Sequence, residues 1–245
     1  DIYLLALRNS VRHQIFHHIE VHSNCILLTE SHQKTLLNSA PVPQKLHVSL
    51  DAQYEETYKR VKGRNGLHQA KANAKRLLLR KKEQDTPWPR VVLQFIIGEN
   101  NYSEAEDFLM YWRDFLSTHE IPFSVSAGHV KEGTDVVIFF RQLDAPTPQR
   151  QNIENQIFYD TVQKMGVNLV SSDDDDHSKL LQDSVKNKYP CSGFWKSPSI
   201  DWQGNLTFCT RDNQLCNAIG NIGEVPFHRL WTSKRVQKIR DNVQN

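Results

Sequence analysis

The chain has 245 residues, of which 38% are hydrophobic and 24% charged, a balance typical of a globular protein and not of a disordered one. No apolar run approaches the roughly 18 residues that a membrane-spanning helix needs, which excludes such a helix within the sequence. The formal net charge of +2 is too small for a dedicated duplex-binding protein. We therefore expect neither a nucleic acid nor a membrane as a partner.

The two ends of the sequence indicate a piece of a longer protein. The chain begins at Asp1 without an initiator Met and enters at once on an apolar run over residues 2–7. No charged region followed by an apolar one marks a secretion signal. The last residue, Asn245, follows closely on a helix-like stretch. We expect a fragment of a cytoplasmic protein.

Hydrophobic periodicity predicts helices and strands that alternate through about residue 170. After a strand at 2–7, the predicted elements in chain order are helix 11–20, strand 25–29, helix 32–37, strand 45–51, helices 53–60 and 67–83, strand 91–97, helix 105–116, strands 123–127 and 136–140, and helix 153–162. A capping box at Ser103–Glu106 is expected to begin the helix at 105. This alternation favours an α/β fold with a parallel sheet covered by helices, as either an open doubly wound sheet or a partial barrel.

The composition changes after residue 170. Residues 171–188, with four consecutive aspartates at 173–176, have the character of a solvated linker. The aspartates lack the spaced ligands and the central glycine of a calcium loop. From Tyr189 the chain becomes aromatic and cysteine-containing, with short elements. The sequence thus predicts a first domain at 1–170, a linker at 171–188 and a second domain at 189–245.

Three of the four cysteines, Cys191, Cys209 and Cys216, fall in this second domain. Short apolar runs on both sides of Gln203-Gly204-Asn205 predict a hairpin, which would bring Cys209 back toward Cys191. In a protein that is not secreted, converging thiols favour a metal or a cluster over a disulfide. Zinc and iron–sulfur both suit thiolate ligands.

The spacing Cys191-x12-Gly204-x4-Cys209, followed by Asp212, Gly220-Asn221-Ile222 and Leu230-Trp231, resembles the SPASM domain of radical SAM enzymes. The resemblance implies a partial (β/α) barrel of radical SAM type, followed by a small SPASM-like domain with a β-hairpin and helices. It also implies that Cys191 and Cys209 are ligands of an auxiliary cluster. Cys216 is either a third ligand or a bystander, and we expect a ligand.

The first domain adds to this resemblance. Val48-Ser49-Leu50-Asp51-Ala52 is similar to the segment around the fourth barrel strand of radical SAM enzymes. By that resemblance Ser49 and Asp51 would bind S-adenosylmethionine, and we expect both to lie at the carboxyl end of a parallel strand and to face an open cleft. Asp51 is also suited to cap the helix that follows.

The resemblance implies an oxidoreductase or a peptide- or protein-modifying enzyme that uses [4Fe-4S] clusters and S-adenosylmethionine to abstract hydrogen, with an electron donor such as ferredoxin or flavodoxin. The family's Cys-x3-Cys-x2-Cys motif is absent, since only Cys25 precedes residue 191. We therefore expect this chain alone not to cleave S-adenosylmethionine. The alternative is a non-enzymatic, degenerate barrel whose cysteine domain holds zinc or a cluster for structure or peptide recognition.

Two further features are interpreted as structural. The pairs His13/His17 and His18/His22 are spaced as neighbours on the predicted first helix, and Glu20 is not placed for an H-E-x-x-H motif, so we expect a polar helix face. Cys25 lies in an apolar run and is expected to be a buried, inert thiol.

Overall fold

The computed structural model describes residues 18–38, 44–131, 133–170, 193–210, 212 and 214–244. The chain divides into two compact units, Asp1–Ser171 and Ser172–Asn245. Several expected features lie outside the described residues. These are the strand at 2–7, residues 11–17 of the first helix, the linker at 171–188 and Cys191.

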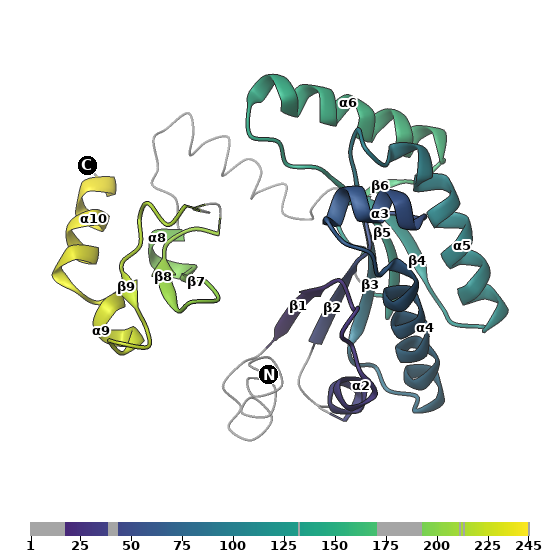
Figure 1. The fold of residues 1–245 in the computed structure, drawn as a ribbon, viewed down its shortest axis with the longest axis horizontal. Coiled ribbons are helices and arrows are strands. Elements are labelled where there is room, and N and C mark those ends of the chain that lie inside the picture. Colours follow the sequence, from purple (N-terminus) through teal and green to yellow (C-terminus); the bar gives the residue numbers. More distant parts are fainter. Residues whose placement is uncertain are drawn as a thin grey trace. The chain divides into compact units, whose positions relative to one another are not determined.

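The first unit is a six-stranded sheet with helices between its strands (Figure 1). Its elements in chain order are β1 (Ile19–Ser23), α2 (Glu30–Leu37), β2 (Gln44–Ser49), α3 (Glu55–Lys62), α4 (Leu67–Glu83), β3 (Arg90–Ile97), the short η1 (Tyr102–Glu104), α5 (Ala105–Thr118), β4 (Ser124–Gly128), β5 (Val136–Gln142), α6 (Pro148–Lys164) and β6 (Leu169–Val170). The strand order is β1-β2-β3-β5-β4-β6, and every pair is parallel. The predicted α/β class is confirmed. Within the described residues the sheet is open, with β1 and β6 at its edges.

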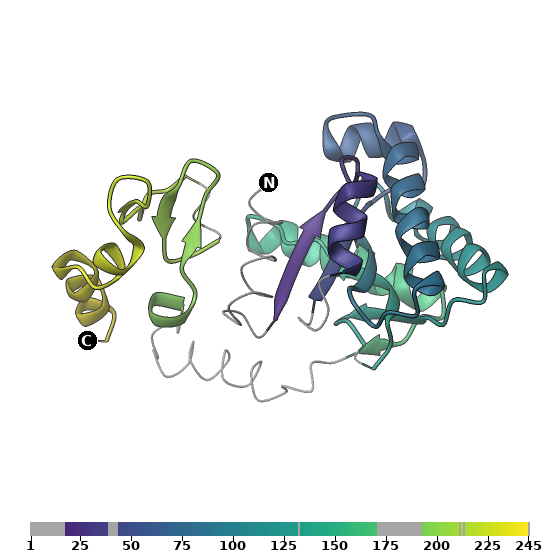
Figure 2. The same cartoon turned by 90° about the horizontal axis from the view of Figure 1, so that it is seen from below.

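The helices cover one face of this sheet, as the two views show (Figures 1 and 2). Alternate strand residues such as Val48 and Leu93 pack into one apolar core with Leu77 of α4, Phe108 of α5 and Phe158 of α6. Because successive strand residues point to opposite faces, the residues between them lie on the other face. That other face carries a separate small cluster and the polar side chains described below.

The connection from β4 to β5 crosses the face without helices. Val130 packs there against Val92, Val137 and Phe139, and Arg90 Nε donates to the carbonyl oxygen of Thr134 at 3.0 Å. The strand order requires this path. β5 lies between β3 and β4, so the connection from β4 to β5 runs toward β1, opposite to the other connections in this sheet. A right-handed crossover in that direction must use the face opposite the helices.

The region around Cys25 differs from the expected strand. The strand is β1, which lies six residues earlier than expected. Residues 24–29 form a turn in which Cys25 has a φ of 59°. Polar side chains stabilise the turn, since Ser23 Oγ accepts the N–H of Cys25 at 3.0 Å and Asn24 Oδ1 accepts that of Ile26 at 3.2 Å. Such local bonds compete with strand pairing. The predicted helix over 11–20 is also wrong at its end, because residues 19 and 20 belong to β1.

The predicted capping box at Ser103–Glu106 is also wrong. Glu104 is the residue that precedes α5, and its side chain makes no capping bond. Its carboxylate instead accepts the backbone N–H groups of Gln53 and Tyr54, at 2.8 and 3.2 Å. The side chain thus fastens η1 to the loop that follows β2.

The second unit is built on a small antiparallel sheet in the order β7-β8-β9. Its elements are α8 (Gly193–Lys196), β7 (Ser199–Ile200), β8 (Asn205–Thr207), β9 (Gly220–Asn221), α9 (Phe227–Trp231) and α10 (Lys234–Gln244). Leu206, Phe208, Ile219, Leu230 and Val236 form its core. The predicted hairpin around Gly204 is confirmed.

None of the helices in the described part of the chain has the length and apolar character that a crossing of the bilayer needs.

Candidate functional site

The carboxyl end of β2 holds both residues expected to bind S-adenosylmethionine. In a parallel sheet the strands end at one edge, which is where ligands of such folds bind. Ser49 is the last residue of β2, and its Oγ accepts a hydrogen bond from Nε2 of Gln94 on β3 at 3.3 Å. Ser49 lies on the sheet face without helices and is half-buried.

Asp51 lies just beyond the strand, and its carboxylate is engaged within the protein. Oδ1 accepts the backbone N–H of Ile96 at 2.7 Å, and Oδ2 pairs with Nζ of Lys62. The residue has a φ of 57° and is 2% exposed. Asp51 therefore joins the ends of β2 and β3 and does not face an open cleft. The difference arises because the carboxylate is the acceptor for the N–H group of Ile96 on β3, which holds it inside the protein.

In the second unit, the hairpin is shaped by Asp201. Its Oδ1 accepts the backbone N–H groups of Gln203 and Asn205, at 2.9 and 2.8 Å. A hydrogen bond from the Asn205 side chain, together with these backbone bonds, lowers the pKa of Asp201. Gly204 has a φ of +89°, and a Cβ there would also approach Asn221 Oδ1 to 3.0 Å, so the turn requires glycine.

The loop after β8 presents two cysteines. Cys209 and Cys216 are both exposed. Asp212 connects their backbones, because its N–H donates to the carbonyl of Cys209 at 3.1 Å and its Oδ1 accepts the N–H of Cys216 at 2.9 Å. Hydrogen bonds to the carboxylate, the largest from Asn217, lower the pKa of Asp212. The carboxylate therefore stays ionised and holds the loop.

Cys209 also lines a cavity of about 430 Å³ in the second unit. The cavity lies along the hairpin, and Trp202 on its wall is 89% exposed. Exposed thiols at both ends of a loop fit the donor set that an iron–sulfur cluster or zinc takes. Cys191, the third expected ligand, lies outside the described residues.

Cys25 differs from Cys209 and Cys216 in its exposure to solvent. It is fully buried, and burial raises the pKa of its thiol to about 12. A thiol with such a pKa stays protonated at neutral pH, and the thiolate is the form that binds metals. The expectation of an inert core thiol agrees with this environment.

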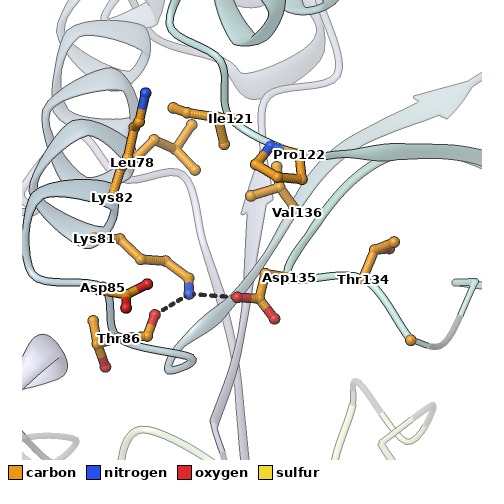
Figure 3. A pocket seen from close by; sticks show the side chains of 11 residues that line it. Leu78, Lys81, Lys82, Asp85, Thr86, Ile121, Pro122, Thr134, Asp135 and Val136 are labelled. Atoms are coloured by element: carbon orange, nitrogen blue, oxygen red, sulfur yellow. Dashed lines mark hydrogen bonds and ion pairs between the residues drawn. The ribbon is translucent and has the colours of Figure 1, made fainter.

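Another cavity, of about 350 Å³, lies in the first unit at the amino ends of the strands (Figure 3). Val136, the first residue of β5, lines it beside Lys81 and Asp135. Lys81 Nζ reaches across to Asp135 Oδ2 at 3.0 Å and to the carbonyl of Thr86. Its charge is thus neutralised, and this end of a β/α sheet usually serves stability and not chemistry.

Comparison with protein families identifies the second unit. Residues 191–245 match the family model SPASM, described as an iron–sulfur cluster-binding domain. These residues form a SPASM domain. The match begins at Cys191 and includes Cys209, Cys216 and Asp212, so the loop described above belongs to the SPASM domain.

Solved structures similar to this chain were also found. Streptococcus suis SuiB has a TM-score of 0.54 at 14% identity, over 97% of this chain and 54% of that one. SuiB bound to S-adenosylmethionine has a TM-score of 0.52 at 13% identity, over 96% and 52%. A weaker likeness, with a TM-score of 0.44 at 10% identity over 92% and 60%, is to anSMEcpe with bound AdoMet and Kp18Cys peptide.

The chain spans about half the length of SuiB. At this identity the likeness shows a shared fold. The expected SPASM resemblance is therefore confirmed for residues 191–245, and the expected fold agrees with that of SuiB. Comparison with curated proteins gives no match.

Sequence reasoning missed one cluster of polar side chains. Glu20 and His22 of β1 and His47 of β2 lie together on the sheet face without helices. The alternation Ile19-Glu20-Val21-His22 is the signal for a half-buried strand that would have revealed it. The helical spacing of His18 and His22 concealed that signal.

Proposed function

We propose that this chain is part of a radical SAM enzyme whose SPASM domain binds an auxiliary [4Fe-4S] cluster. One observation carries the proposal: the matched domain presents Cys209 and Cys216 on an exposed loop that Asp212 holds in place. The enzyme would be an oxidoreductase or a peptide- or protein-modifying maturase. It would act by hydrogen abstraction from its substrate after S-adenosylmethionine is cleaved.

Cys191, Cys209 and Cys216 are the proposed ligands in this chain. When bound, the cluster would supply an electron-transfer centre or an iron that holds substrate. The protein's own part is to hold the thiolates, which the hydrogen bonds of Asp212 to both ends of the loop accomplish. Trp202, exposed beside the Cys209 cavity, offers an apolar surface for substrate.

The first unit would contribute to the S-adenosylmethionine pocket. Ser49 is the proposed contact, since its hydroxyl lies at the carboxyl end of β2 on the face without helices. Asp51 is proposed to act at the same strand end, where its bonds to Ile96 and Lys62 fix the backbone. A complete barrel would need strands beyond those described.

A peptide or protein substrate and an electron donor such as ferredoxin or flavodoxin belong to the same proposal. We also propose the division of the chain into a first domain at 1–170, a linker at 171–188 and a SPASM domain from 189. A cytoplasmic location is proposed as well, because thiolate ligands persist in a reducing compartment.

Anaerobic reconstitution with iron and sulfide tests the proposal. Iron and labile sulfide per chain are measured for the wild-type chain, for Cys191→Ala, Cys209→Ala and Cys216→Ala, and for Cys25→Ala as the control. Loss of both at Cys191→Ala and Cys209→Ala, with Cys25→Ala unchanged, is the expected result. A wild-type chain that takes up neither iron nor labile sulfide would contradict the cluster.

A further inference from the structure

Three metal-ligating side chains converge on the sheet face without helices. His22 and His47 are register partners on the neighbouring parallel strands β1 and β2, and Glu20 lies two residues before His22 on the same face. Glu20 Oε1 is 3.1 Å from His22 Nε2 and 2.9 Å from His47 Nε2. All three ligand atoms lie within 4.8 Å of one another.

The hydrogen bonds around His47 determine which of its two ring nitrogens carries the proton. Gln94 donates from Nε2 to Ser49 Oγ, so its amide oxygen faces His47 Nδ1, at 3.3 Å. The Nδ1 atom of His47 is therefore the one that carries the proton. Metal-binding histidines are oriented in this way, with the second ring nitrogen donating to an oxygen.

The Nε2 atom of His47 is consequently unprotonated, and its lone pair points at Oε1 of Glu20. It is buried, with the side chain 6% exposed, and it makes no hydrogen bond. Because the proton is on Nδ1, Nε2 has no hydrogen to donate to Glu20. Two acceptors at 2.9 Å repel each other unless a cation lies beside both.

The charges around Glu20 leave Oε1 for that cation. Lys45 Nζ and His18 Nε2 approach the other oxygen, Oε2, at 3.7 and 3.8 Å. His22 is half-exposed and stacks on His47 with ring centroids 4.1 Å apart. A metal bound at roughly 2.0–2.1 Å lies in the plane of each imidazole, so the exposed His22 ring would turn out of the stack to bind.

We propose that Glu20, His22 and His47 bind a divalent first-row transition-metal ion. Two imidazoles and one carboxylate leave a coordination position open for water or a substrate group, as in catalytic zinc and non-haem iron sites. The ligands contain no sulfur, so this site is separate from the cysteines of the SPASM domain. His47 is also linked through Gln94 to Ser49, which places the ion next to the proposed S-adenosylmethionine contact.

Titration of the full chain with Zn²⁺ and with Co²⁺ tests this site. Calorimetry measures the Zn²⁺ affinity, and the Co²⁺ spectrum reports the ligand type, because thiolate ligands add a charge-transfer band that nitrogen and oxygen ligands lack. The variants are Glu20→Gln, His22→Ala and His47→Gln. The matched control is His68→Ala, which removes an exposed histidine of α4.

The expected result is a Zn²⁺ site that persists, with a Co²⁺ spectrum free of the thiolate band, when Cys191, Cys209 and Cys216 are all replaced by alanine. Each of the three variants should weaken this site about tenfold or more, and His68→Ala should leave it unchanged. Glu20→Gln is decisive, because Glu20 is 38% exposed and its replacement does not disturb the core. Unchanged affinity in Glu20→Gln, equal weakening in His68→Ala, or Co²⁺ bound only with the thiolate band would overturn the proposal.

Discussion

Asp212 accepts the backbone N–H of Cys216 through Oδ1 at 2.9 Å. Its Oδ2 accepts the N–H of Asn217 at 2.9 Å and the hydroxyl of Thr207 at 3.0 Å. Since its own N–H donates to Cys209, this one residue fixes both ends of the cysteine loop. Asp212 thus orders two of the three proposed cluster ligands.

Replacing Asp212 should reduce the amount of cluster that the chain retains. Asp212→Ala removes both side-chain oxygens that accept hydrogen bonds from the loop, whereas Asp212→Asn keeps one of them. Iron per reconstituted chain should therefore be highest in the wild type, lower in Asp212→Asn and lowest in Asp212→Ala. Glu224→Ala, an exposed change in the same unit, is the control and should load as the wild type does. Full loading of Asp212→Ala would show that the loop needs no such support.

Asp51 should be important for stability as well as for the proposed pocket. Asp51→Ala leaves the N–H of Ile96 without its acceptor. It also places alanine in the left-handed backbone region, which asparagine and aspartate tolerate better. We expect the free energy of unfolding to fall by about 3 kcal/mol. Asp51→Asn should cost less, because asparagine tolerates this backbone conformation and its oxygen can accept the same N–H. Urea unfolding of the two variants measures the difference, and equal losses would contradict this account of the carboxylate.

The thiols should differ sharply in reactivity. Because the pKa of Cys25 is raised to about 12 and the side chain is buried, iodoacetamide should leave it unmodified in the folded chain at neutral pH. Cys209 and Cys216, both exposed, should be alkylated in the metal-free chain. Mass spectrometry of the digested protein gives the labelling of each cysteine, and alkylation in urea serves as the control in which Cys25 reacts. Rapid labelling of Cys25 without denaturant would contradict its burial.

Glu55 should stabilise α4 in a pH-dependent way. Its carboxylate accepts the backbone N–H groups of Leu67 and His68, both at 3.3 Å, and that of Gly66, at the start of a helix with no cap of its own. These bonds lower the pKa of Glu55 below 4.5. The unfolded chain therefore takes up this proton first, and the stabilisation is present above about pH 4.5 and is lost as the pH falls through the lower, folded value.

Glu55→Gln tests this capping role. At pH 7 the variant should lose about 1 kcal/mol of unfolding free energy, the usual value of a helix cap. The difference from the wild type should shrink as the pH is lowered below 4.5. Glu56→Gln, a change at the exposed neighbouring residue, is the control. A difference that persists unchanged in acid would show that the carboxylate charge is not the cause.

Elements with long periodic patterns were predicted correctly from sequence. The helix expected over 67–83 is α4, with the same bounds, because its apolar face repeats over many turns and glycines precede it. The strand expected over 91–97 is β3, since a strand buried on both faces is a continuous apolar run. The turn at Cys25 was missed because its apolar residues resemble a strand, and only Ser23 and Asn24 distinguish it.

The candidate sites could likewise be predicted only where their residues are close together in the sequence. The cysteine loop was recognisable because its residues are close together in the sequence. The set of Glu20, His22 and His47 was not, because it depends on the register that pairs His22 with His47 across two strands. Asp51 was located correctly at the end of β2, yet its contact with Ile96 requires a neighbouring strand that no local pattern specifies.

The Mössbauer spectrum of the anaerobically reconstituted wild-type chain tests the central claim, that the SPASM domain holds an iron–sulfur cluster, most directly. The account predicts the signature of a [4Fe-4S] cluster, absent from Cys209→Ala and present in Cys25→Ala. A spectrum of isolated, oxygen- or nitrogen-bound iron in the wild type, unchanged by Cys209→Ala, would contradict it.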